Sequence, residues 1–142
     1  MSSKSLLAVV FMLLSNAGFS QSEKLSMDAL IKRNLAFAKD QYALLESTLP
    51  ADRMPKSYNM QTEKLETSDT KWWCSGFYPG TLWYIHEYTK DTGTRKAAEA
   101  RLAILEKEKH FTGNHDLGFM MYCSFGNAYR ITGNPSYKTT ID

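Results

Sequence analysis

Apolar residues recur at alternating steps of four and three between Ser26 and Leu49, and this spacing predicts an amphipathic helix. The repeating positions are Ile31, Leu35, Ala38, Tyr42 and Leu45. Ser26 can cap the start of this helix, and Pro50 ends it because proline lacks the amide hydrogen that the next turn needs. The pattern therefore predicts a first helix over residues 26–49.

The segment from Pro50 to Thr70 is polar and has no helical or alternating period. It contains a second proline, Pro55, and no convincing strand. Structureless stretches of this length are uncommon in compact domains and are usually either functional loops or mobile segments. We expect a loop over one face of the fold.

Four further helices are predicted after this segment, which makes the expected fold class all-α. Proline favours the first helical turn and glycine favours helix ends, so these residues define the boundaries. The second helix starts near Tyr78 and is stopped by Gly93, the third spans 94–109, the fourth starts near Asp116, and the fifth opens at Pro135.

A repeat of about 40 residues underlies these helices. Gly76-Phe77 recurs 42 residues later as Gly118-Phe119, and Thr92-Gly93 recurs 40 residues later as Thr132-Gly133. Each Gly-Phe pair opens an aromatic-rich helix, and each Thr-Gly pair closes it. Two helices per repeat are typical of stacked helical hairpins, in an open solenoid or a closed toroid. Because such hairpins are stable only against neighbours, we expect the chain to be the N-terminal part of a longer protein.

The first 20 residues predict a secretory signal peptide. Lys4 supplies a short positive region, Leu6 to Leu14 is apolar, and small polar residues lead to a cleavage site near Ser20. An apolar run this short does not span a bilayer, which takes about 20 residues. We therefore expect residues 1–20 to be removed, residues 21–142 to form part of one domain, and the product to be periplasmic or secreted without a stable membrane anchor.

Composition excludes several classes of function. With 17 Lys and Arg against 15 Asp and Glu, the chain lacks the excess positive charge of a nucleic-acid-binding protein. The three histidines, His86, His110 and His115, have no metal-ligand spacing, so no metal is expected. Cys74 and Cys123 lie in apolar segments, where a free buried thiol is the favoured interpretation.

The first cluster that can carry chemistry runs from Trp72 to Trp83. Aromatic rings at the mouth of a helix suit stacking on a sugar, and glycines here allow close approach of backbone or of a ligand. Phe77 and Trp83 are expected in the core. Trp72 and Trp73 come just before the helix, and for one of them stacking on a ligand and packing in the protein are both open.

The second cluster is His115-Asp116, directly before the fourth helix. An aspartate there can simply cap the helix, or it can be an ionised carboxylate that faces a ligand on the same rim as the tryptophans. His115 can donate to a substrate oxygen or carboxylate, or be an ordinary surface residue.

The motifs Trp73-Cys74-Ser75-Gly76-Phe77 and His115-Asp116-Leu117-Gly118-Phe119 resemble glycoside hydrolase family 88, the unsaturated glucuronyl hydrolases, and the similarity extends from Trp73 to about Tyr137. The resemblance implies an (α/α)6 toroid that is incomplete in this chain, no cofactor, and an unsaturated oligosaccharide as substrate. The implied reaction removes a terminal 4,5-unsaturated uronic acid from lyase products by hydrating a vinyl ether. Asp116 matches an essential aspartate, His115 a substrate-binding histidine and Trp73 an aromatic residue of the sugar site.

The family's second aspartate, a general acid and base, is expected beyond residue 142, so the chain alone should be inactive. Two alternatives remain: a non-catalytic helical-repeat module that binds protein or glycan, and an unsaturated rhamnogalacturonyl hydrolase of the same fold. No oligomeric state follows from the sequence.

Overall fold

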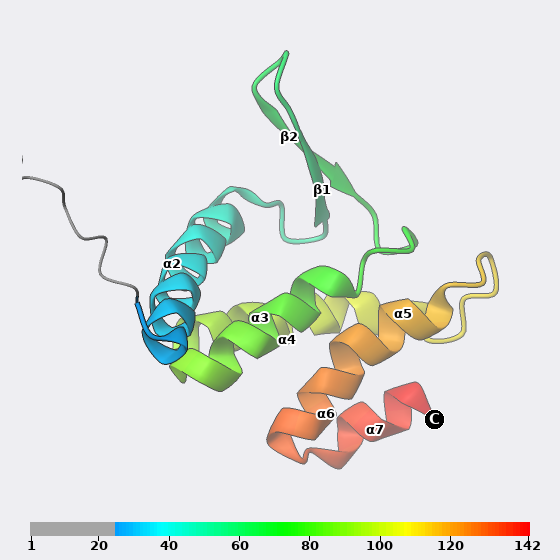
Figure 1. Cartoon of the computed structure of the whole chain (residues 1–142). Helices are drawn as coiled ribbons and strands as arrows, with labels where there is room; N and C mark the ends of the chain where they lie inside the picture. The colour runs from blue at the N-terminus through cyan, green and yellow to red at the C-terminus, as the bar shows by residue number, and fades with distance from the viewer. Residues whose placement is uncertain (1–24) are drawn as a thin grey trace, which may run out of the picture. The chain divides into compact units, whose positions relative to one another are not determined.

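The computed structural model describes residues 25–142, and the predicted signal peptide, residues 1–20, lies outside this described part. The chain divides into two units, Met1–Leu30 and Ile31–Asp142, and the packing described below belongs to the second. Its elements are drawn in Figure 1. They are α2 (Met27–Thr48), β1 (Met54–Asn59), β2 (Lys64–Ser68), α3 (Phe77–Thr89), α4 (Thr92–Leu105), a 3₁₀ turn (Glu106–Glu108), α5 (Leu117–Met121), a π-helical turn (Tyr122–Gly126), α6 (Asn127–Thr132) and α7 (Pro135–Ile141).

Helix α2 confirms the first predicted helix. The Ser26 hydroxyl accepts a hydrogen bond from the Ala29 amide at 3.2 Å, as a cap at this position should. In the C-terminal half of α2, Tyr42 and Leu45 pack against the core, and Leu49 just beyond the helix is buried.

The segment between the first two predicted helices is a β-hairpin, so the prediction of a loop without strands was wrong. Strands β1 and β2 pair antiparallel, with Tyr58 opposite Leu65. Met54 at the base is fully buried, and this contact anchors the hairpin on the helical core. The strands are poor in β-branched residues, and Glu63 takes a positive φ of 52° in the turn where glycine or asparagine is usual. The usual sequence signals of a hairpin are therefore absent.

Helices α3 and α4 form the first helical hairpin, but α3 ends earlier than Gly93. Lys90 adopts the left-handed conformation (φ 58°) and closes α3. The Asp91 carboxylate then accepts the Thr94 amide at 2.7 Å, which starts α4 at Thr92. Gly93 therefore lies in the first turn of α4 and stops no helix, whereas Gly133 (φ 69°) does close α6.

The predicted fourth helix is present but interrupted by the π-helical turn between α5 and α6. The Ser124 hydroxyl in this turn donates to the Met120 carbonyl at 2.5 Å. The side-chain amide of Asn127, directly after the turn, donates to the Cys123 carbonyl at 2.9 Å. Such turns leave carbonyls without their usual helical partners, and polar side chains here satisfy them.

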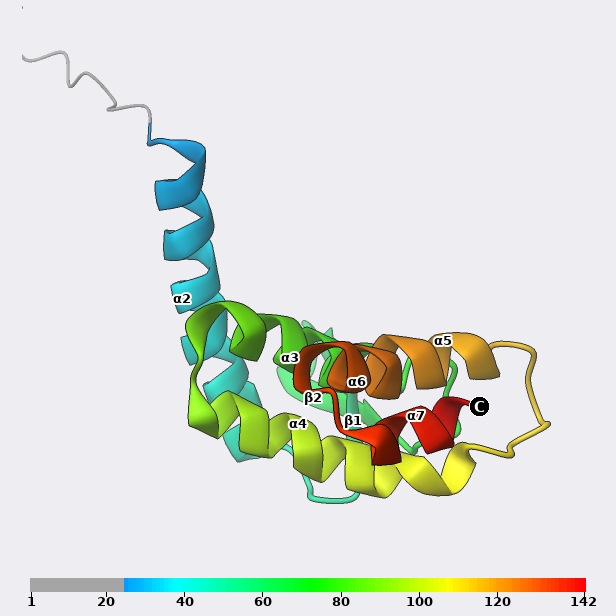
Figure 2. The ribbon, with the colours of Figure 1, turned by 90° about the horizontal axis from the view of Figure 1, so that it is seen from below.

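Two glycines bring α3 against the second repeat. A Cβ atom at Gly76 would lie 2.0 Å from the Met120 carbonyl oxygen, and one at Gly80 would lie 2.3 Å from the Cys123 carbonyl oxygen. Both distances are shorter than atoms tolerate, so only glycine permits this approach. The sequence left open whether the glycines permit close approach of the backbone or of a ligand. The structure shows that Gly76 and Gly80 permit close approach of two backbone segments. Figure 2 shows α4 running alongside α3, and α3 also contacts the π-helical turn and α6.

The core lies where the hairpin base and the helices meet. Its buried residues are Leu49, Met54, Tyr78, Leu82, Trp83, Ala98, Leu102, Leu105, Met120, Met121, Phe125 and Ala128. Trp83 is fully buried, which confirms its predicted place in the core.

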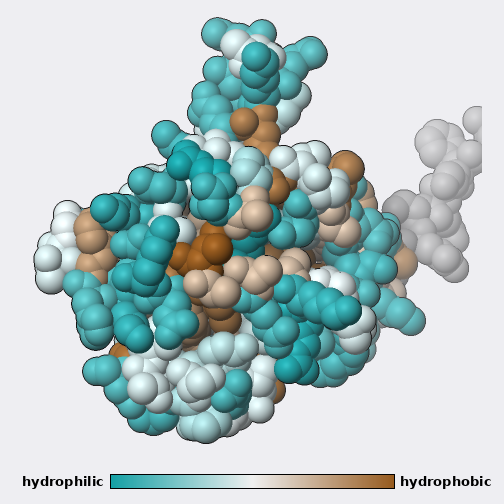
Figure 3. All heavy atoms as spheres, turned by 180° about the vertical axis from the view of Figure 1, so that it is seen from behind, coloured by the Kyte–Doolittle hydropathy of each residue, from teal (hydrophilic) through white to brown (hydrophobic). Residues whose placement is uncertain are grey.

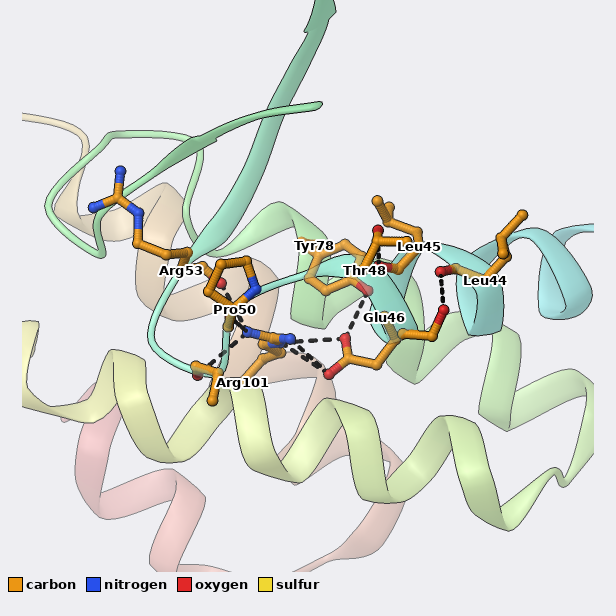
Figure 4. Close-up of polar contacts among 10 residues, drawn as sticks. Leu44, Leu45, Glu46, Thr48, Pro50, Arg53, Tyr78 and Arg101 are labelled. Atoms are coloured by element: carbon orange, nitrogen blue, oxygen red, sulfur yellow. Dashed lines mark hydrogen bonds and ion pairs between the residues drawn. The ribbon is translucent and has the colours of Figure 1, made fainter. Parts of the chain in front are cut away.

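Arg101 of α4 connects α2 and the following loop to the helical hairpin. Its guanidinium contacts the Glu46 carboxylate at 2.7 Å and donates to the carbonyls of Pro50 and Arg53, both at 2.8 Å (Figure 4). The Tyr78 hydroxyl donates to the same carboxylate at 2.8 Å. The Arg101 side chain is only 3% exposed, and these bonds account for its charge and its donors.

On the face seen in Figure 3, polar side chains predominate and apolar side chains are exposed between them. Across residues 25–142, no helix combines the length and the apolar character needed to cross a bilayer.

Candidate active site

The tryptophan pair lies on two successive turns immediately before α3. The Ser75 amide donates to the Trp72 carbonyl at 2.8 Å, and the Phe77 amide donates to the Cys74 carbonyl at 3.0 Å. Trp72 is half-buried, whereas Trp73 is 46% exposed. The exposure of Trp73 favours the ligand-stacking interpretation over packing.

Trp73, Phe77 and Phe119 form a row of aromatic rings on the surface, named here the aromatic row. Trp73 meets Phe77 edge-on at 5.9 Å between centroids, and Phe77 lies 6.3 Å from Phe119. Phe77 is 38% exposed, so its predicted place in the core was wrong. The repeat explains the row, because Phe77 and Phe119 are equivalent positions in neighbouring repeats whose helices pack through Gly76.

Asp116 occupies the N-cap position of α5 but does not cap it through its side chain. Its carboxylate accepts no backbone hydrogen bond, although its carbonyl accepts the Met120 amide at 3.1 Å. The side chain is 20% exposed and lies 3.6 Å from His115 Nε2. The simple capping interpretation therefore fails, and the carboxylate remains available to a ligand.

The Asp116 carboxylate influences the thiol that follows the tryptophan pair. Burial raises the pKa of the Cys74 thiol, and the negative charge of Asp116 raises it further. Cys74 directly follows Trp73 in the chain. The charge of Asp116 therefore acts on a group in the segment that carries the tryptophans.

His115 projects into solvent, with 95% of its side chain exposed. It lines a shallow cavity of about 330 Å³ together with Gly118, Phe119, Tyr122 and Cys123. Tyr122 is 60% exposed. His115, Phe119 and Tyr122 thus form an open amphipathic surface next to Asp116, of the kind that suits a sugar ring.

The sequence motifs did not predict a ligand contact for three residues of this site, Phe77, Phe119 and Tyr122. For the two phenylalanines the signal was present in the sequence, because a Gly-Phe pair repeated at 42 residues brings equivalent side chains together. Tyr122 lies at the start of the π-helical turn, and no sequence pattern predicted that turn.

A second cavity, of about 320 Å³, lies between α2, the hairpin and α3. The Lys56 ammonium there lies 5.9 Å from the centre of the Trp72 ring. Phe77 also lines this cavity, whereas its neighbour Phe119 lines the cavity beside His115. Trp72 thus faces the hairpin, while Trp73 joins the aromatic row.

Among residues 25–142, no three His, Cys, Asp or Glu side chains are grouped closely enough to hold a metal ion. Cys74 and Cys123 are both free thiols. The chemistry available in the described site is that of a carboxylate, an imidazole and aromatic rings.

Stacked helical hairpins indicate a helical-repeat architecture, and the exposed aromatic rings offer apolar faces to a ligand. A solved structure of an unsaturated glucuronyl hydrolase specific for heparin matches the chain with a TM-score of 0.71 and 34% identity, over 77% of this chain and 29% of that one. An unsaturated glucuronyl hydrolase from Formosa agariphila is 35% identical over 99 residues, 69% of this chain and 25% of that protein. No family model matches the chain.

The resemblance of the motifs to the unsaturated glucuronyl hydrolases is confirmed, since the chain is similar in sequence and in structure to a part of such enzymes. The predicted fold class, helical hairpins of an α/α toroid, is confirmed, with the β-hairpin as an addition. The chain spans about a quarter of the length of the curated relative.

Proposed function

We propose that the protein containing this chain removes a terminal 4,5-unsaturated uronic acid from oligosaccharides produced by polysaccharide lyases. The observation that carries the proposal is the location of Asp116 and His115 beside the aromatic row, in a chain similar to unsaturated glucuronyl hydrolases. Trp73 stacks on the apolar face of the sugar, and His115 donates to a sugar oxygen or carboxylate.

The reaction is hydration of the vinyl ether. A proton adds to C4, the carbon that the ring oxygen makes electron-rich, and positive charge develops on C5 and the ring oxygen. Water adds to C5 and gives a hemiketal, which opens and releases the rest of the oligosaccharide. Asp116, as a carboxylate without a backbone hydrogen bond, stabilises this developing charge.

A second carboxyl group has to donate the proton and activate the water, because Asp116 cannot be both a stabilising anion and an acid. In this proposal that group belongs to a part of the protein outside these 142 residues. The 142-residue chain alone is then inactive, while the full-length gene product turns over substrate.

The test is turnover of unsaturated disaccharides by the full-length gene product, followed by loss of the ultraviolet absorbance of the double bond. Asp116→Asn should lower kcat roughly 10²–10³-fold, because the amide cannot stabilise positive charge. Asp52→Asn, an exposed aspartate in the turn after α2, is the matched control and should retain activity. Full activity of Asp116→Asn would contradict the assignment, and binding without turnover by the wild type would favour a non-catalytic module.

Galacturonyl-rhamnose substrates belong in the same assay. Preferential turnover of these would move the protein to the sister activity on rhamnogalacturonan fragments. Turnover by residues 21–142 alone would overturn the requirement for a second carboxyl group outside them.

We also propose that the protein is exported and cleaved near Ser20. The mass of the mature protein from the periplasm or medium checks this, and a retained N-terminus would contradict it.

A further inference from the structure

Asn114 joins the two segments of the candidate site through a single side-chain amide. Its Nδ2 donates to the Lys71 carbonyl at 3.2 Å, and its Oδ1 accepts the Asp116 backbone amide at 2.8 Å. Lys71 directly precedes the tryptophan pair and lies 43 residues from Asn114 in the chain. One planar group thus spans the distance between the tryptophan segment and the aspartate.

The tryptophan segment has an independent anchor on its other side. The Thr70 hydroxyl donates to the Glu108 carboxylate at 2.6 Å, and both residues are buried. This contact holds Thr70 against the end of α4, whatever the conformation of the loop before α5. The hydrogen bonds of Asn114 therefore have a different role: they set the position of Asp116 relative to the tryptophan segment, which Thr70 already holds in place.

Asparagine suits this position because the two contacts need opposite hydrogen-bonding roles. Lys71 offers an acceptor and Asp116 offers a donor, and a carboxamide supplies one donor arm and one acceptor arm in a rigid plane. Aspartate keeps only the acceptor arm, and its second oxygen would face the Lys71 carbonyl oxygen. Alanine removes both arms.

We propose that Asn114 is a positioning residue that sets the register between the Asp116 carboxylate and the ring of Trp73. The inference rests on the proposed function, since it assigns those two groups to one sugar. A sugar stacked on Trp73 meets the carboxylate correctly only when the amide holds both segments. Misplacement of a catalytic group by about 1 Å can cost 10²-fold in rate without preventing binding.

The kinetic test uses Asn114→Ala and Asn114→Asp in the full-length gene product with an unsaturated disaccharide. Both should lower kcat roughly 10–100-fold and change KM less than about threefold, because stacking on Trp73 is retained. A loss confined to Asn114→Asp would point to its added charge and overturn the positioning role. Equal kcat in all three proteins would also overturn it.

Asn127→Ala is the matched control. Asn127 likewise uses both arms of its amide, donating to the Cys123 carbonyl at 2.9 Å and accepting from Arg130 Nε at 3.3 Å, but within one helical segment. It should lose similar stability to Asn114→Ala and keep its kcat. A parallel loss of kcat in Asn127→Ala would mean that general destabilisation explains the effect.

Hydrogen exchange separates this inference from the proposed function. The amide of Asp116 should exchange faster in Asn114→Ala than in the wild type, while Asn114→Asp keeps the acceptor and the protection. Identical exchange in the three proteins would overturn the contact even in an active enzyme. If the wild type fails to turn over any unsaturated disaccharide, the proposed function fails, and the exchange result still decides whether Asn114 holds Asp116.

Discussion

Tyr78 shows how a single side chain serves both the core and the polar network beneath the site. Its ring stacks on Tyr42 at 5.7 Å with planes 13° apart, and its hydroxyl donates to Glu46. Burial, the hydrogen bond to Glu46 and the charge of that carboxylate raise the pKa of Tyr78 well above its ordinary value of 10. Each of these disfavours the phenolate.

This shift predicts a specific loss of stability in alkali. Below pH 10 the phenol is protonated in the folded and unfolded states, so the stabilisation is complete. Above pH 10 only the unfolded chain releases the proton readily, and the free energy of unfolding falls as pH rises. Urea unfolding from neutral pH to about pH 11 should therefore show a steeper decline for the wild type than for Tyr78→Phe. Parallel curves would contradict the shift.

The site residues show what a sequence reveals at this scale. Trp73, His115 and Asp116 could be named from motif and helix position, but their surroundings could not. The sequence allowed Asp116 to be a helix cap and predicted a core position for Phe77, and the structure has neither. Exposure depends on which helix packs across the residue, and that information lies elsewhere in the chain.

Helix boundaries are set by local contacts, and α4 is the clearest case. The Asp91 carboxylate accepts hydrogen bonds from the Thr94 amide at 2.7 Å and from the Thr94 hydroxyl at 2.9 Å. Both bonds hold the pKa of Asp91 below its ordinary value of 3.8, and the bond from the Thr94 amide has the larger effect.

Loss of this cap should destabilise the protein in a pH-dependent way. Asp91→Ala should cost about 1 kcal/mol at neutral pH, whereas Asp91→Asn keeps an acceptor and should cost less. The stabilisation from the ionised carboxylate is present above pH 3.8 and disappears as pH falls through the lowered pKa. Denaturant midpoints of the three proteins at neutral and acid pH check this, and a pH-independent difference between wild type and Asp91→Asn would contradict it.

The contact of α3 with the second repeat depends on Gly76 and Gly80. The sequence shows where these glycines lie but not which backbone they approach. Gly76→Ala should destabilise the protein by about 3 kcal/mol, because the new methyl group collides with the Met120 carbonyl and forces α3 from the second repeat. Gly118→Ala is the control at the equivalent repeat position. A Cβ added at Gly118 would have no atom of another segment within 4 Å. Alanine there should therefore leave the free energy of unfolding unchanged or raise it by up to about 1 kcal/mol. Chemical denaturation measures both, and equal effects would exclude the close packing as the cause.

For the whole molecule, the connection made by Arg101 joins parts that the sequence separates widely. Glu46 lies 55 residues before Arg101, and the acceptors Pro50 and Arg53 lie in the loop leading to β1. One guanidinium thus connects α2, the base of the hairpin and α4.

Breaking this connection should cost far more than removing an exposed ion pair. Arg101→Ala should destabilise by about 3–5 kcal/mol, because it leaves the Glu46 carboxylate without its cation and the Pro50 and Arg53 carbonyls without this donor. Arg95→Ala removes the exposed pair with Glu99 and should cost about 0.5 kcal/mol or less. Urea unfolding of both variants gives the comparison, and similar losses would show that Arg101 has no special role.

Local sequence by itself determined the helices, most of their starts, the repeat and the candidate residues Trp73, His115 and Asp116. Capping, periodicity and motif spacing are short-range properties, so they can be read along the chain. Only the tertiary structure decided the β-hairpin, the π-helical turn, the exposed aromatic row and the Asn114 contact. The hairpin, the aromatic row and the Asn114 contact depend on atoms distant in sequence: Met54 on the core, Gly76 against Met120, and Lys71 beside Asn114. Their energies come from packing and from hydrogen bonds across segments, which no local pattern encodes.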